Sequence, residues 1–347
     1  MGKIELGLCC ICLSLKEEGA AYKTVTAKHF ESLPRNAAVE KLENICLNNA
    51  AVAAKIIEFC AQNGISHYRL PSDIFPLFTL QRLNLSPDFL PRRCEIFKAL
   101  RNVGKTAKKC GVGLSTHPSQ FTVFASANAE IRKNSAIEIN FNARILDLAG
   151  LPKSPESPIN VHINSNPDRP SFVSDFEDGL SMLSPSARKR LAVENEDRGA
   201  WNVSRLAEFL TKYKIPLTFD FLHHKLNNCG ESEKSAFIAA AKTWGEYTPI
   251  FHYAESASLE KPREHSDYCK NFPPYFGTPY ICQIEAKKKD LAIERLINEH
   301  AKNSRRRNSR ACGNRASGLL RNPTRDKDEK RRGFKIVHGQ VARNRKV

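Results

Sequence analysis

Imidazole and carboxylate side chains recur at or just after the ends of short apolar segments. They lie in the motifs THP, NVHIN, LAVEN, TFDFLHH, PIFHY and CQIEAK, and they are His117, His162, Glu194, Asp220, His223, His252 and Glu285. Each one alone is explained better as an ordinary capped, hydrogen-bonded or surface polar group. Together, such groups beside apolar segments would lose hydration and repel one another unless cations or shared protons compensated them.

A mixed imidazole and carboxylate set suits Zn, Mn or Fe better than Ca or Mg. We therefore predict a divalent metal site, with two to three Mn²⁺ or Zn²⁺ ions and no nucleotide cofactor. Bound metal ions promote the hydrolysis of phosphodiesters, because they lower the pKa of a bound water molecule and stabilise the leaving oxygen. Glu194, His223 and Glu285 are the residues expected to be catalytic. A serine nucleophile is disfavoured, because Ser115 near His117 lacks the sharp turn of a nucleophile elbow.

The elements that must position these residues can be read from the spacing of apolar side chains. Short apolar or alternating segments predict eight strands, at Ile4–Leu8, Ser66–Leu70, Val112–Thr116, Ile159–Ile163, Leu191–Glu194, Pro216–Asp220, Pro249–Tyr253 and Pro279–Glu285. Helical spacing fills the intervals, most clearly at Ala37–Gln62, Asp88–Cys110, Ala127–Ala149, Trp201–Tyr213 and Glu231–Trp244.

Eight alternations of strand and helix predict an α/β protein, a single (β/α)8 TIM-type barrel. The metal ligands would then meet at the C-terminal rim of the strands, where barrel enzymes place their sites. An open doubly wound sheet is the competing architecture, and it binds a dinucleotide through a glycine-rich turn after its first strand. That turn is missing here, because Gly7 is followed by Leu-Cys-Cys.

Composition restricts the class of protein further. The hydrophobic fraction is 41%, and no apolar run is long enough to span a bilayer, so no membrane role is expected. The N-terminus lacks the order of a signal peptide, which leads us to expect an intracellular, cytoplasmic protein with its 11 cysteines reduced.

The positive charge is concentrated at the C-terminus. Residues 302–347 hold 16 Lys or Arg and 3 acidic residues, which leaves only about +4 of the net charge of +17 to the rest of the chain. We expect a barrel domain over 1–300 and a basic, disordered tail over 301–347. The tail is interpreted as a solvated segment in preference to a non-specific DNA-attracting arm. The site, and not the total charge, therefore carries the functional argument.

The motifs THPSQFT, NVHIN, LAVENED, TFDFLHH and IEAKKKD resemble, in order and spacing, those of the UV damage endonuclease family. The resemblance covers roughly residues 1–298 and includes HYRLPSD. This family is a barrel relative of endonuclease IV and of sugar isomerases. Its members nick DNA immediately 5′ of cyclobutane pyrimidine dimers and 6-4 photoproducts, some also at abasic sites, and leave 3′-hydroxyl and 5′-phosphate ends.

The resemblance implies that all seven residues above are metal ligands, with Glu194 as the bridging carboxylate. It also implies that Gln120 and Phe121 probe the lesion by filling the space of extruded bases, although a core position for Phe121 is an alternative. Further candidates for phosphate binding or for support of the ligands are Arg69, Lys287, His224 and His265.

Three departures from the family pattern concern the details of the site. No histidine follows Pro76, Ile250 stands where some members carry a modified lysine, and Leu8 and Cys12 stand where some carry tyrosine and asparagine. One metal site would then be weaker, or completed by water, His224 or His265.

Two other functions remain open on the residues alone. A sugar isomerase or epimerase could use the same barrel and metals on a hydroxy-ketone. A non-catalytic nucleic-acid binder would depend on the basic tail, and removal of residues 302–347 would then abolish binding. We favour the endonuclease, acting on double-stranded DNA with UV lesions and expected to be a monomer, and we expect tail removal to weaken binding only modestly.

Overall fold

Eight parallel strands form one sheet in the computed structural model, which describes residues 4–119 and 121–316. The strands are β1 (Ile4–Cys9), β2 (His67–Leu70), β3 (Gly113–Thr116), β4 (Ile159–Val161), β5 (Leu191–Glu194), β6 (Leu217–Thr218), β7 (Ile250–Tyr253) and β8 (Tyr280–Ile284). Each overlaps a segment that the sequence predicted as a strand. The observed β6 is much shorter than the predicted Pro216–Asp220.

Helices alternate with the strands along the chain. The major ones are α3 (Arg35–Gln62), α4 (Arg93–Cys110), α5 (Ala129–Leu148), α6 (Phe172–Ser181), α8 (Val203–Thr211), α10 (Glu233–Lys242) and α11 (Lys289–Ala316). Shorter ones are α1 (Leu13–Glu17), α2 (Ala27–Ser32), α7 (Pro185–Arg190) and α9 (Phe221–Leu226), with 3-10 turns at Gln81–Leu83 and Pro87–Phe89. Local signals set several ends: Asn128 caps the start of α5, and Gly111 ends α4 with a positive φ of 65°.

The sheet closes into a barrel, which confirms the predicted fold class. The strands follow the order β6-β5-β4-β3-β2-β1-β8-β7, and all ladders are parallel. A parallel bridge between Asp220 and His252 joins the two outer strands, and the His252 backbone N–H donates to Phe219 O at 3.0 Å. All strands are parallel, so their C-terminal ends share one rim.

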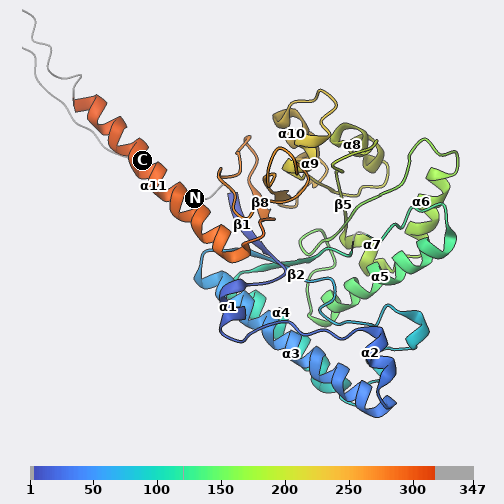
Figure 1. Ribbon diagram of the computed structural model, residues 1–347. Coiled ribbons are helices and arrows are strands. Elements are labelled where there is room, and N and C mark those ends of the chain that lie inside the picture. The colour runs from blue at the N-terminus through green and yellow to red at the C-terminus, as the bar shows by residue number, and fades with distance from the viewer. Residues whose placement is uncertain (1–3, 120, 317–347) are drawn as a thin grey trace, which may run out of the picture. The chain divides into compact units, whose positions relative to one another are not determined.

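Helices α3, α4 and α5 lie outside the strands (Figure 1) and contact β2, β3 and β4, and the apolar core is formed by residues of both layers. The strands contribute buried residues to the core, among them Leu8, Tyr68, Leu114 and Val193. These residues belong to the same continuous apolar cluster as the buried residues of the helices. Inside the barrel, Ser115 Oγ contacts His67 Nε2 at 3.0 Å and accepts a hydrogen bond from Gln283 Nε2 at 2.8 Å. Ser115 is thus engaged inside the barrel, and no Ser115–His117 hydrogen bond is present.

The compact barrel unit ends at His300. Helix α11 continues through the first part of the predicted tail, as far as Ala316, and residues 317–347 lie outside the described residues. The boundary and the disorder expected over 301–347 therefore stay predictions, with a helix observed in the segment up to residue 316. Among the described helices, none is both long enough and apolar enough to cross a membrane.

Candidate metal centre

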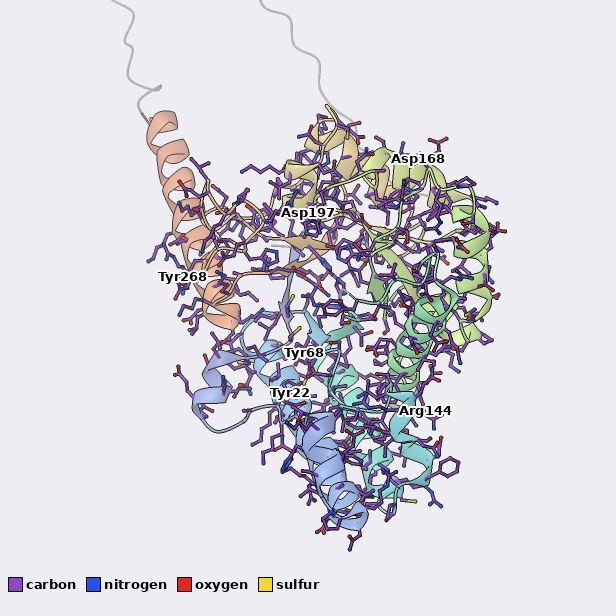
Figure 2. The ribbon with its side chains drawn as sticks, turned by 45° about the vertical axis from the view of Figure 1, so that its right-hand side comes forward. Tyr22, Tyr68, Arg144, Asp168, Asp197 and Tyr268 are labelled. Atoms are coloured by element: carbon purple, nitrogen blue, oxygen red, sulfur yellow. The ribbon has the colours of Figure 1, made fainter. Side chains whose placement is uncertain are left out.

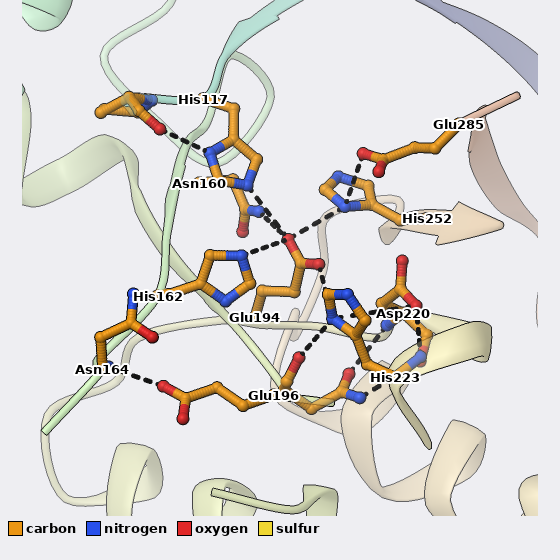
Figure 3. A network of polar contacts seen from close by, with 12 residues as sticks. His117, Asn160, His162, Asn164, Glu194, Glu196, Asp220, His223, His252 and Glu285 are labelled. Atoms are coloured by element: carbon orange, nitrogen blue, oxygen red, sulfur yellow. Dashed lines mark hydrogen bonds and ion pairs between the residues drawn. The ribbon is translucent and has the colours of Figure 1, made fainter. Parts of the chain in front are cut away.

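The predicted ligands follow the C-terminal ends of successive strands. His117 comes directly after β3, His162 directly after β4, and Glu194 is the last residue of β5. His252 lies within β7, and Glu285 comes directly after β8. Because the strands are parallel and closed into a barrel, these side chains meet at one rim, as Figure 3 shows.

Asp220 and His223 reach the same place through a helix cap. Asp220 is the N-cap of α9, and its Oδ1 accepts a hydrogen bond from the His223 backbone N–H at 2.7 Å. The cap fixes the backbone just after β6 and places both side chains at the rim. The TFDFLHH motif therefore supplies two donors from one short turn.

Glu194 is the centre of the cluster and is only 2% exposed. Its Oε2 lies 3.3 Å from His117 Nε2, 3.8 Å from His162 Nε2 and 3.0 Å from His252 Nδ1. Its Oε1 lies 3.1 Å from His223 Nδ1. One carboxylate thus faces four imidazoles with both of its oxygens, which is the geometry that the bridging role requires.

The donor atoms fall into three groups that could each hold a metal ion, with all atoms of a group within 4.8 Å of one another. The groups are His117–His162–Glu194, Glu194–Asp220–His223 and Asp220–His252–Glu285. Glu194 belongs to the first two groups, and Asp220 belongs to the last two. The structure therefore brings all seven predicted ligands together in one chain of overlapping groups.

The buried carboxylates and imidazoles of this cluster shift one another's pKa values. Burial opposes a charged imidazole, but Asp220 and Glu194 raise the pKa of His223 to about 11. Burial also opposes ionisation of Glu194, yet His252 and His162 hold the pKa of that carboxyl well below its usual range. Burial lowers the pKa of His162 to about 4. The carboxylates thus hold protons on some of the imidazoles, in positions where cations could replace those protons.

Two buried atoms of the third group support metal binding independently. Asp220 is fully buried, and its Oδ2 has no hydrogen-bond partner. His252 Nδ1 lies at ion-pair distance from Glu194 and, at 3.4 Å, from Glu285 Oε1, without a well-aligned hydrogen bond. An unpartnered buried carboxylate oxygen is costly, and coordination of a cation by Asp220 would satisfy it while the ring of His252 offers a further donor. The residues present therefore fit a divalent metal.

Sequence reasoning missed two asparagines that hold the ligands. The Asn160 side-chain amide donates to Glu194 Oε2, and Asn160 is 4% exposed. Asn195 Nδ2 donates to Asp220 O at 3.1 Å, and Asn195 O lies 2.9 Å from His223 Nδ1. The period of two along a strand could have identified Asn160, because it lies two residues before His162 and on the same face.

The four supporting candidates lie in different environments. Arg69 forms an ion pair with Glu285, and His265 Nδ1 lies 3.8 Å from Glu285 Oε2, so both contact a predicted ligand. Lys287 pairs instead with Glu264 at the surface. His224 is 3% exposed and packs against Phe219 with a ring distance of 5.3 Å, and it belongs to none of the three donor groups.

The two predicted probe residues differ in what can be described. Gln120 lies outside the described residues. Phe121 is 80% exposed in the loop after β3, so the alternative of a core aromatic is excluded. Phe121 lies four residues after the predicted ligand His117, and its role as a lesion probe stays a prediction.

The three departures from the family pattern also have structural descriptions. Ile250 is buried in β7, and Leu8 and Cys12 are buried in and after β1, so all three serve as apolar packing residues. Leu77, the residue after Pro76, has a positive φ of 72°. None of these positions offers a ligand atom to the donor groups.

Comparison with known proteins identifies the family. The model of the UV-endonuclease UvdE family matches residues 4–312. The chain belongs to this family. The UV DNA damage endonuclease of Bacillus cereus (strain G9842) is 28% identical over 289 residues, which cover 80% of this chain and 88% of that relative. The relative of the same name from Bacillus thuringiensis subsp. konkukian (strain 97-27) is 26% identical over 288 residues, with the same coverage.

The fold is found again in a solved relative. The crystal structure of SacUVDE matches with a TM-score of 0.73 and 23% identity, and the match covers 87% of this chain and 99% of that one. Membership of the UvdE family confirms the resemblance inferred from the motifs and the enzyme class of UV damage endonuclease. It also favours the endonuclease over the sugar isomerase that the ligands alone left open.

Proposed function

We propose that this UvdE-family member is a metal-dependent repair endonuclease that cuts double-stranded DNA immediately 5′ of cyclobutane pyrimidine dimers and 6-4 photoproducts. Abasic sites are a further expected substrate, and the products would carry 3′-hydroxyl and 5′-phosphate ends. The observation that carries this proposal is the meeting of seven imidazole and carboxylate donors in three overlapping groups at one rim of the barrel.

The donor groups suit two to three divalent ions, with Mn²⁺ or Zn²⁺ as the expected metals. Such ions would polarise the phosphoryl group, make water a better nucleophile near neutral pH and stabilise the leaving oxygen. Glu194 and Asp220 each join two donor groups and so fix the spacing between them. Glu194, His223 and Glu285 are the proposed catalytic residues.

Residues around the donors would keep the site in its working arrangement. Arg69 holds Glu285 by an ion pair, and Asn160 holds Glu194 by a hydrogen bond. Arg69 is 9% exposed, so it acts on the ligand more than on solvent-exposed phosphate. His265, with its ring 31% exposed beside Glu285, is the better placed of the two histidines proposed to complete the site.

Lesion recognition is proposed for Gln120 and Phe121. Extrusion of bases from a duplex costs a few kcal/mol, and it costs less when a lesion has already weakened the stack. Stacking of an aromatic ring on a base recovers about 1 to 3 kcal/mol per base. The exposed ring of Phe121 can supply that contact without losing any packing in the core. Specificity would then come from the deformability of damaged DNA.

The decisive experiment uses purified full-length protein, expected to be monomeric, with UV-irradiated and unirradiated plasmid and added Mn²⁺. We expect nicks only in the irradiated plasmid, and end-labelling should place them on the 5′ side of the lesions. Elemental analysis of the His117→Ala, Glu194→Ala and Glu285→Ala variants should show metal and nicking lost together. A folded, metal-loaded protein that leaves irradiated plasmid intact would contradict the proposal.

A further inference from the structure

An ordered hairpin stands on the rim beside the metal centre. It follows β7 and comprises residues 254–266, here called the rim hairpin. An antiparallel bridge joins Ser256 and His265, and the Ala257 backbone N–H donates to Glu264 O at 2.7 Å. The turn is tightened further by Ser256 Oγ, which donates to Pro262 O at 2.7 Å. The hairpin is therefore preformed and does not need a ligand to order it.

Ion pairs hold the rim hairpin to neighbouring rim loops. Arg263 Nε lies 3.0 Å from Oδ2 of Asp197, a residue labelled in Figure 2 that lies in the loop after β5. Glu264 pairs with Lys287 in the loop after β8, and His265 lies beside the proposed ligand Glu285. The base of the hairpin is thus fixed next to the donor cluster.

The tip of the rim hairpin carries one large apolar side chain that no described residue covers. Leu259 is 95% exposed, more than any other large apolar side chain in the described residues. The nearest cations are engaged with carboxylates, because Lys261 lies 3.4 Å from Glu264 and Arg263 pairs with Asp197. Leu259 is the one large apolar side chain that the hairpin exposes, among the exposed charged residues Glu260, Lys261 and Arg263. A leucine side chain suits the faces of bases better than phosphates, and the two basic residues beside it are compatible with a DNA backbone nearby.

Leu259 and Phe121 lie on opposite sides of the rim. Phe121 follows β3 and the rim hairpin follows β7, and these strands are four positions apart in both directions around the eight-stranded barrel. The donor cluster, with ligands from the strands between them on both sides, lies in the middle. The loops that carry these two exposed apolar side chains thus leave the rim on opposite sides of the donor cluster.

We infer that Leu259 is a second DNA wedge, which enters the damaged duplex from the side opposite Phe121 and helps to hold it unstacked over the metals. This inference rests on the proposed function. Leucine side chains that insert between base steps unstack and kink DNA in other protein–DNA complexes. A protein partner is a poorer fit, because one leucine provides far less area than a specific protein interface buries.

The test compares full-length, metal-loaded Leu259→Ser with wild type on a short duplex that carries one cyclobutane dimer and a 2-aminopurine beside it. We expect the nicking rate at subsaturating enzyme to fall about tenfold, as the loss of one buried leucine contact implies. The rise in aminopurine fluorescence on binding should shrink, while the metal content stays unchanged. Leu259→Met should restore nicking to within about twofold, because it conserves apolar volume.

Met182→Ser is the matched control, because Met182 is also an exposed apolar residue but follows the C-terminal end of α6, away from the rim. It should behave as wild type. The inference is overturned if Leu259→Ser nicks damaged DNA and unstacks the aminopurine like wild type, or if it loses metal. It is also overturned if the wild-type protein proves to be a dimer and the substitution makes it a monomer, since Leu259 would then be a subunit contact. Wild type that unstacks the aminopurine without nicking would refute the proposed function alone, because the fluorescence would still test the wedge.

Discussion

Asn160 offers the sharpest test of how the metal centre is built. Its side-chain amide donates to Glu194 Oε2, the oxygen that faces His117, His162 and His252. Asn160→Leu keeps a similar volume in this buried position and removes the hydrogen bond. We expect the variant to fold, to bind metal more weakly and to nick damaged DNA more slowly at limiting metal.

The magnitude follows from the environment of the bond. A hydrogen bond to a charged group contributes about 1.5 to 3 kcal/mol. Loss of a group that supports a metal ligand costs about 10- to 100-fold in metal affinity, which corresponds to about 1.4 to 2.7 kcal/mol. Glu194 is 2% exposed, so water cannot replace the lost donor and the effect should lie within this range.

Metal affinity would be measured by competition with a chelator, with nicking followed as Mn²⁺ is titrated. Excess Mn²⁺ should restore much of the activity, since the ligands themselves are intact. Thr116→Val is the matched control, because Thr116 is 1% exposed next to His117 and its hydroxyl has no hydrogen-bond partner. If Asn160→Leu binds metal as tightly as wild type, within about twofold, the proposed support of Glu194 is wrong.

Three further predictions concern other parts of the molecule. Glu194→Gln should lose two of the three donor groups and Glu285→Gln only one, so elemental analysis should find fewer ions in the first variant, and equal metal contents would argue against the shared ligand. Phe121→Ala should weaken binding to lesion DNA about 5- to 100-fold through lost stacking, with metal content unchanged; a loss of metal would instead show a structural role. Deletion of residues 302–347 should weaken binding modestly and flatten its salt dependence while nicking is retained, and the assay is nicking over a series of salt concentrations.

The fold was predictable because strand and helix periods alternate clearly along the chain. Apolar segments such as Leu191–Glu194 are buried on both faces and read as strands with little ambiguity. The ends were harder to predict, because β6 stops at Thr218, two residues before Asp220, whose backbone N–H donates to the Asn195 side chain and whose carboxylate caps α9. Helix α11 extends into a basic segment of low apolar content, where no apolar spacing marks its end in the sequence.

The candidate site was predictable where a residue type alone suggests metal chemistry. Histidines and carboxylates at strand ends could be placed on one rim once the strands were assigned. Residue type alone could not identify Asn160 and Asn195, because asparagine has many roles. The period of two places Asn160 on the same face as His162, but only the contacts show what either asparagine holds. His224 and Lys287 were indistinguishable from site residues until the structure placed one against Phe219 and the other beside Glu264.

The way the barrel closes links catalysis to the integrity of the cylinder. In the described residues, the backbones of the β6 and β7 segments are joined by the Asp220–His252 bridge and the neighbouring hydrogen bond from His252 to Phe219, and the Phe219 ring packs against Phe251. Both bridged residues also contribute donors to the third group, together with Glu285. An ion bound there would cross-link the β6 and β7 sides of the point where the barrel closes. Removal of the metal would then weaken the contact between β6 and β7 first. The hydrogen-exchange rate of the His252 backbone amide should rise before that of amides in the other strands.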